Sequence, residues 1–413
     1  MHVIRKFGLG FTDLPTLIWN VSVLLRVITL NIDGRNRTPI PKAFHASTIT
    51  LISCYFYVYF VSMIWYVFFY CRRTSDWISA IIVFSLGVAS QIGVCYQFDC
   101  IFFFRSSVRD VVAEYLTCDE LLIPASRFES NILKTMRHVK KRALIFWIVI
   151  ISNGFVYVTK PLVIPGRHLP EDEFILLGLN PVHESPNFEI AYLVTIAGVM
   201  ITVYLPSNIT AFLIIITGYT EAQMLALAQE MQLIWDDAEI YYRNYKNLRG
   251  NYPIEDHIKM KKLIINNFIK YRLKDVIKIH TINLKLISKV ESVFRGAMAI
   301  EFTILIISLT AVLLGGLEKT YLELPFALMQ VAIDCFIGQK VIDACEIFEK
   351  SVYASKWERF DKSNMTTVLV ILQTAQKKMT LSAGGMITLS YPSLMAILKS
   401  IYSTFTTLRS TLK

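Results

Sequence analysis

The stretch IAYLVTIAGVMITVYLPSNITAFLIIITGY, residues 190–219, decides the fold. It carries no charged side chain over about thirty positions, and a helix needs only about 20 apolar residues to cross a bilayer. Within lipid, every backbone N–H and C=O group must be paired inside the segment. We therefore predict a membrane-spanning helix that protrudes from the bilayer and continues beyond it.

Six further apolar segments lie on either side of this stretch. They are residues 48–70, 77–98, 143–159, 298–317, 324–344 and 383–408. The chain is therefore predicted to be an all-α, polytopic membrane protein with seven transmembrane helices. The last three segments carry charges, which at that depth normally face the bundle interior or water. These charged residues are Glu301, Asp334, Lys340, Asp343 and Lys399.

The composition excludes most soluble classes. Hydrophobic residues make up 54% of the chain and charged residues only 18%, whereas a soluble domain has about 25% charged residues. The sequence contains no phosphate-binding loop, zinc-protease helix or nucleophile elbow. Asp334 and Asp343 are nine residues apart, so they should face opposite ways and form no catalytic dyad. We expect no enzyme activity, no cofactor and no metal site.

The distribution of basic residues predicts the orientation. The N-terminus and alternate loops hold 33 of the 42 Lys and Arg residues, and the loops on the other side hold 7. By the positive-inside rule the N-terminus is cytoplasmic, and seven spans then place the C-terminus outside. A G-protein-coupled receptor has the reverse orientation. Anionic lipid accounts for the net charge of +10, so no nucleic-acid partner is expected.

Five regions follow from these spans. Residues 1–47 form a cytoplasmic amphipathic segment, which lies on the membrane surface or packs on the bundle. Residues 48–219 hold the first four spans and an acidic outer loop at 160–189. Residues 220–297 are predicted to be a helical anchor below the membrane; a membrane-surface or calmodulin-binding helix is the alternative. Residues 298–382 hold two spans and a linker, and residues 383–413 hold the last span.

The last span has one polar face. Lys399, Ser403, Thr406 and Ser410 follow the spacing 4, 3, 4, and Thr407 flanks them. Ile397, Ile401, Phe405 and Leu408 lie on the opposite side. A polar face within a bilayer must point at water or at another helix. It therefore indicates either a pore lined by several copies of the helix or interhelical packing.

Two stretches near the C-terminus resemble insect odorant receptors. Residues 380–390, Thr-Leu-Ser-Ala-Gly-Gly-Met-Ile-Thr-Leu-Ser, and residues 396–408 are similar to the C-terminal signature of that family. Residues 330–357, with Cys335, Gly338, Tyr353 and Trp357, resemble its sixth helix and following linker. The resemblance implies an odorant-gated cation channel of four subunits, in the plasma membrane of sensory-neuron dendrites, whose last helices line a shared pore.

The resemblance also implies roles for individual residues. Thr407 and Ser410 fall where the family gate lies, and Lys399 would place a cation in the pore wall unless it pairs with an acid or reaches water. A ligand pocket is implied in the outer half of the second to sixth helices, where the side chains suit a neutral volatile ester, alcohol or aldehyde. These side chains are Trp77, Ile81, Phe84, Ser152, Phe155, Tyr192, Met200, Tyr204, Ser308 and Val312.

Two departures favour an odorant-tuning subunit over the shared co-receptor. The 220–297 loop lacks the co-receptor's insertion, and the last helix reads Ser403-Thr404-Phe405 and then Arg409-Ser410. A co-receptor subunit is then the implied partner, in a heteromeric tetramer. A gustatory-type channel subunit, a multi-pass transporter and a receptor that signals through a G protein are the alternatives.

Overall fold

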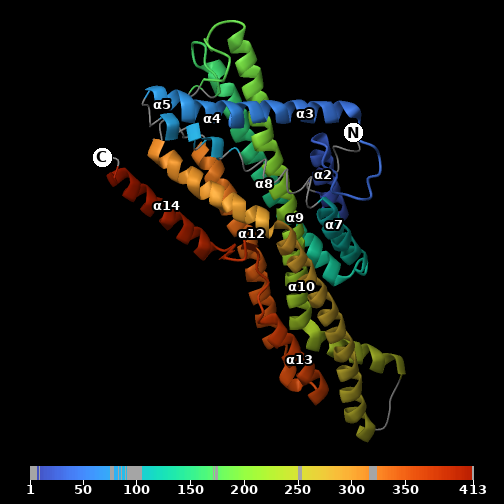
Figure 1. The fold of residues 1–413 in the computed structure, drawn as a ribbon. Helices are drawn as coiled ribbons and strands as arrows, with labels where there is room; N and C mark the ends of the chain where they lie inside the picture. The colour runs from blue at the N-terminus through green and yellow to red at the C-terminus, as the bar shows by residue number, and fades with distance from the viewer. Residues whose placement is uncertain are drawn as a thin grey trace.

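The structure is a computed structural model of a bundle of long helices (Figure 1). It describes residues 7–8, 10–74, 79–81, 83–84, 86–88, 90, 105–170, 172, 175–249, 254–315 and 323–411. The long helices are α3 (Lys42–Phe56), α7 (Arg105–Glu120), α8 (Arg127–Val163), α9 (Asn187–Arg249), α10 (Ile254–Gly315), α12 (Glu323–Tyr353) and α14 (Tyr391–Thr411). This architecture confirms the predicted fold class.

Helix α9 is the centre of the molecule. It runs from one end to the other in Figure 1, and α3, α8, α10 and α12 all contact it. Its middle part, from Leu205 to Ala228, is almost continuously buried. The predicted extension beyond the fourth span is confirmed, because residues 220–249 continue the same helix without a break. Helix α9 ends at Arg249 and α10 begins at Ile254, and residues 250–253 lie outside the described residues.

In the part of the chain that the structure describes, five helical stretches are long and apolar enough to cross a membrane. They are Lys42–Thr74, Arg127–Val163, Asn187–Asn247, Ile258–Leu314 and Leu324–Arg359. These stretches contain the first, third, fourth and sixth predicted spans, and the fifth as far as Leu314. The second, 77–98, lies partly outside the described residues, although Ser79–Val88 forms a shorter apolar helix. The third helix runs past the predicted limit at residue 159, because α8 continues to Val163 with Pro161 in its last turn.

The predicted start of the last span is wrong. Residues 383–390 are not helical; a short hairpin of β1 (Ser382–Ala383) and β2 (Ile387–Thr388) precedes α14. Gly384 and Gly385 form its turn with φ of +66° and +76°, a left-handed conformation that glycine adopts without steric cost. The helix then begins at Tyr391, where the Ser390 hydroxyl accepts a hydrogen bond from the Ser393 N–H.

The N-terminal segment packs on the bundle. Helix α2 (Leu14–Val27) contacts α7 and α9, and Leu14, Leu17, Ile18 and Leu25 are buried. The Asp13 carboxylate caps its first turn by accepting from the Thr16 N–H. Of the two alternatives for residues 1–47, packing on the bundle is therefore correct for this helix.

The residues predicted to form an anchor lie in a limb at the bottom of Figure 1, called the anchor limb below. It is built from the C-terminal part of α9, the N-terminal part of α10, the C-terminal part of α12 and α13 (Lys362–Ala375). Apolar residues at helical spacing from Ile258 to Val290 form a stripe on α10, and its members Ile265, Ile269, Leu286 and Val290 are buried in this limb. Ile258 is the exception at 79% exposed, because it lies in the first turns of α10, beyond the packed limb. Asn283, which interrupts the stripe, is buried and donates to the Ile279 carbonyl one turn back.

Candidate functional site

The two faces of α14 have different environments. The helix contacts α10 and α12, and on the contact side Ile397 and Ile401 are 6% and 4% exposed. The residues predicted to line a pore are all exposed on this single chain: Lys399, Ser403, Thr406, Thr407 and Ser410. The helix lies at the edge of the molecule (Figure 1), so its polar face is open to a neighbouring subunit or to water.

The hydroxyl groups on this face donate to their own helix. The Thr406 and Thr407 hydroxyls donate to the Ser403 carbonyl at 2.8 and 3.0 Å, and the Ser410 hydroxyl donates to the Thr407 carbonyl at 2.7 Å. A hydroxyl has one proton and two lone pairs. Because the proton is directed at the backbone, the oxygen presents acceptor capacity outward. A row of such oxygens suits a hydrated cation better than an anion.

The base of α14 is attached firmly to its neighbours. The Tyr391 N–H donates to the Gln339 side-chain oxygen of α12 at 3.1 Å, and the Gly384 N–H donates to the Arg295 carbonyl of α10 at 3.0 Å. Gly338 of α12 lies so close to Leu389 that an added Cβ would overlap the Leu389 carbonyl oxygen. The start of α14 is therefore joined to α12, and the hairpin before it to both α10 and α12.

A cavity of about 220 Å³ lies beside the C-terminal half of the first predicted span. It is formed where π-helical turns, Tyr57–Ser62 and Tyr66–Tyr70, face the helix at 79–88. Its lining has no charged side chain, and Gly87 allows close approach to Met63. The residues that line it include Tyr59, Phe60, Met63, Ile64, Phe68, Val83 and Phe84. Such a space accepts a small neutral apolar molecule.

The ten predicted ligand-binding residues are not gathered in one described cavity. Phe84 lines the cavity just described, and Ile81 is half-buried on the same helix. Trp77 lies outside the described residues. Ser152, Phe155 and Met200 are exposed, whereas Ser308 and Val312 are buried in the core.

The two predicted tyrosines serve packing contacts. The Tyr192 hydroxyl donates to the Val158 carbonyl at 3.2 Å and joins α9 to α8. The Tyr204 hydroxyl donates to the Leu24 carbonyl at 2.9 Å and holds α2 against α9. The cavity residues of the first span were not predicted, because the resemblance placed the pocket among later helices. The dense aromatic run at 55–70 was the available signal.

A layer of polar side chains crosses the bundle interior. The Trp147 indole donates to Asn208 at 3.2 Å, and Gln330 donates to the Thr210 hydroxyl at 2.7 Å. Glu301 and Asp334 are each 1% exposed, which confirms that these two charges face the bundle interior. Asp343 is 40% exposed, so the two aspartates of α12 do face apart as predicted.

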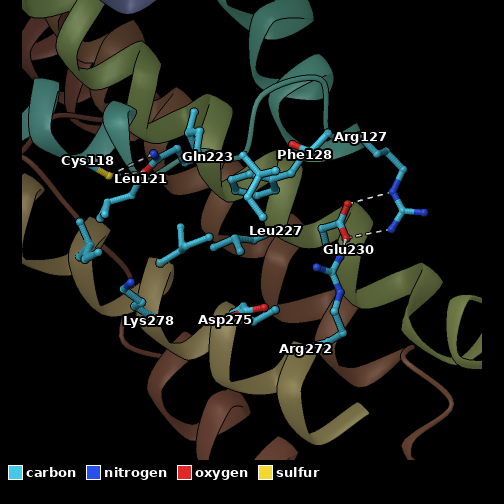
Figure 2. A pocket seen from close by; sticks show the side chains of 16 residues that line it. Cys118, Leu121, Arg127, Phe128, Gln223, Leu227, Glu230, Arg272, Asp275 and Lys278 are labelled. Atoms are coloured by element: carbon cyan, nitrogen blue, oxygen red, sulfur yellow. Dashed lines mark hydrogen bonds and ion pairs between the residues drawn. The ribbon is translucent and has the colours of Figure 1, made fainter. Parts of the chain in front are cut away.

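The anchor limb contains an ion-pair network. Arg127, in the first turn of α8, binds Glu230 at 2.8 Å and Asp237 at 2.6 Å, both on α9. Arg272 of α10 contacts the same Glu230 carboxylate, which is 7% exposed. One carboxylate therefore joins three helices, and it borders a second cavity (Figure 2).

Comparison with known proteins identifies relatives. The sequence matches the family described as 7tm Odorant receptor over residues 89–402. It is 23% identical to Odorant receptor 22a of Drosophila melanogaster over 145 residues, which are 33% of this chain and 36% of that protein. It is 22% identical to Odorant receptor 22b of the same species over 142 residues. The chain thus matches 36% of the length of each of these curated relatives.

The fold is similar to solved insect receptors. The structure of the insect olfactory receptor OR5 from Machilis hrabei has a TM-score of 0.70 and 13% identity, covering 95% of this chain and 97% of that chain. The same receptor in complex with eugenol has a TM-score of 0.71, covering 96% and 98%. At this identity the likeness shows the fold alone.

Proposed function

Since this chain belongs to the insect 7tm odorant receptor family, we propose that it is an odorant-binding subunit of a ligand-gated, non-selective cation channel. It is therefore a receptor and not an enzyme. The channel proposal rests on the environment of the two faces of α14. Ile397 and Ile401 on its apolar side are buried where the helix contacts α10 and α12, while its hydroxyl-bearing face is left open on the single chain.

The proposed ligand is a neutral volatile molecule bound in the outer half of the bundle. The uncharged lining of the 220 Å³ cavity around Phe84 supports this chemistry, because an apolar pocket with few polar groups does not solvate an ion. The related OR5 receptor has been solved with eugenol, and a ligand of that kind is the class that we propose here. The binding residues then include Phe60 and Met63 as well as Phe84.

The proposed partner is a co-receptor subunit in the plasma membrane. Four copies of this chain would bring four Lys399 side chains near one axis, which disfavours cations. A partner without these charges reduces that barrier. The cytoplasmic stretch 346–378 also carries both signs of charge, which suits a complementary neighbour.

Currents recorded with and without a co-receptor, against a panel of neutral odorants, test this function. We expect odorant-evoked cation current from the pair, without GTP and without a gradient of the odorant. A current that requires GTP would indicate G-protein signalling, and transport that follows the ligand gradient would indicate a transporter. Phe84→Ala should shift odorant sensitivity, with Leu193→Ala, an exposed position outside the cavity, as its control.

A further inference from the structure

The anchor limb contains a second cavity, far from the one around Phe84. Its volume is about 290 Å³, and it is enclosed by the corner between α7 and α8, the far part of α9 and the first half of α10. Figure 2 shows Leu121 and Phe128 of the corner, Leu227 of α9, and Asp275 and Lys278 of α10 around this space. From this geometry we propose that the cavity binds a small, neutral amphipathic molecule from the cytoplasm.

The size of the cavity limits the ligand. An apolar cavity of about 150 Å³ accommodates benzene, so 290 Å³ holds roughly ten to twelve non-hydrogen atoms. Six side chains provide an apolar floor for such a body: Leu121, Leu122, Phe128, Leu227, Val276 and Ile279. This floor is built by three separate segments, so an occupant contacts the α7–α8 corner, α9 and α10 at once and holds them together.

The charges around the cavity are already balanced. Arg127 and Arg272 both form ion pairs with Glu230, and Arg127 forms a second ion pair with Asp237. Asp275 and Lys278, both exposed, place one charge of each sign at the rim. Because a guanidinium has five N–H donors, Arg272 has further donors for an oxygen of the ligand. A neutral head group therefore fits better than a free anion or cation.

The distance between the cavity and the apolar part of α8 argues against the acyl chain of a bilayer lipid as the ligand. The apolar part of α8 begins at Ala143, and Phe128 lies fifteen residues earlier on the same helix. At 1.5 Å per residue this places the cavity about 22 Å beyond the apolar segment. The charged run at 134–142 lies between them. A lipid tail would have to leave the bilayer to reach it, whereas a dissolved amphiphile would not.

A cysteine at the floor of the cavity reports occupancy directly. The full-length Ile279→Cys variant, in lipid nanodiscs, would be labelled with N-ethylmaleimide in the presence of 1-decanol, decanoate or decylammonium. Because the native Cys118 also lines the cavity, mass spectrometry of the labelled peptides follows residue 279 by itself. At ten times its Kd, 1-decanol should slow labelling of the introduced thiol about ten-fold. The charged congeners, which share the ten-carbon chain, should protect much less. Leu122→Trp, which fills the floor, should abolish the protection.

Two controls keep the result interpretable. Leu263→Cys lies on the same helix, is exposed and does not line the cavity, so its labelling should not respond to 1-decanol. Equal protection at both positions, or no protection of Ile279→Cys at saturating 1-decanol, would overturn the site. Stronger protection by decanoate or decylammonium would overturn the neutral class. The readout needs no channel current, so it stands or falls separately from the proposed function.

Discussion

At the scale of single residues, Gly338 of α12 is a position where α12 lies very close to the residues that precede α14. A Cβ at this position would overlap the Leu389 carbonyl oxygen, and backbone cannot give way as a side-chain tip can. Gly338→Ala should therefore lower the free energy of unfolding by about 1–3 kcal/mol. Gly296→Ala is the matched control, because nothing lies within 4 Å of its added Cβ. It should be neutral or stabilising by up to about 1 kcal/mol.

Thermal unfolding of both purified variants measures this difference. A Gly338→Ala protein as stable as Gly296→Ala would mean that the hairpin at 382–388 yields easily. In that case the close approach of α12 to Leu389 does not couple α12 to α14.

Asp119 provides a residue-level prediction on pH. Burial raises the pKa of this carboxyl, with neighbouring acids adding to the effect, although the Tyr219 hydroxyl donates to it at 2.9 Å and opposes the shift. The folded chain then holds the proton more tightly than the unfolded chain, whose aspartate pKa is about 3.9. The stability contributed by this group is therefore present at low pH and is lost as pH rises through the folded pKa.

Asp119→Asn should remove that decline while keeping an oxygen that accepts from Tyr219. Melting temperatures of the variant and the parent, measured between pH 4 and pH 7, should diverge in favour of the variant as pH rises. Parallel curves across this range would show that Asp119 is not the group responsible.

Individual residues of the ligand site are the part of the molecule that is hardest to predict from the sequence. A helix in lipid is apolar on its lipid face and on its packed face alike, so composition does not separate the two. The predicted ligand set groups Phe155 and Met200 with Val312, yet the first two are 68% and 58% exposed and the last is fully buried. Glu301 and Asp334 are easier to place, because a carboxyl group cannot face hydrocarbon without a large cost.

At the scale of elements, α14 can be tested face by face. Ser403→Cys and Thr407→Cys lie on the open face, and Ile397→Cys and Ile401→Cys lie on the packed face. If the open face lines the pore, a cationic methanethiosulfonate reagent should reduce odorant-evoked current in the first pair and leave the second pair unchanged. Equal effects on both faces, or block only at the packed face, would contradict the pore assignment.

The elements show which parts of the fold a sequence reveals. The continuous helix α9 was predictable, since residues 187–249 contain one proline and no strong breaker in the cytoplasmic half. The N-terminal limit of α14 was not, because the run around 383–390 is apolar enough to extend the span. Only the left-handed turn at Gly384-Gly385 diverts these residues into a hairpin. The cavity in the anchor limb depends on three segments meeting, which no single stretch discloses.

At the scale of the whole molecule, assembly determines what the charges on α14 do. On one chain Lys399 is exposed, and the Arg409 guanidinium lies 5.7 Å from the centre of the Phe405 ring on the same helix. In a tetramer of identical chains with this polar face inward, four Lys399 charges would surround one narrow conduit, whereas Arg409 is turned toward Phe405 on the other side of the helix. Even at an effective dielectric of about 20, their repulsion of a cation amounts to several kcal/mol.

The lone subunit should therefore conduct cations poorly, and a co-receptor should restore odorant-gated current. Lys399→Gln keeps a polar side chain of similar length but removes the charge, so it should raise cation conductance or alter selectivity if residue 399 faces the pore. Single-channel recordings of the parent and the variant, each with and without the co-receptor, measure both effects. Because fewer copies of Lys399 surround the axis in a mixed tetramer, the gain should be larger without the partner. Robust current from the lone subunit that Lys399→Gln leaves unchanged would refute both the partner requirement and the position of Lys399 in the pore wall.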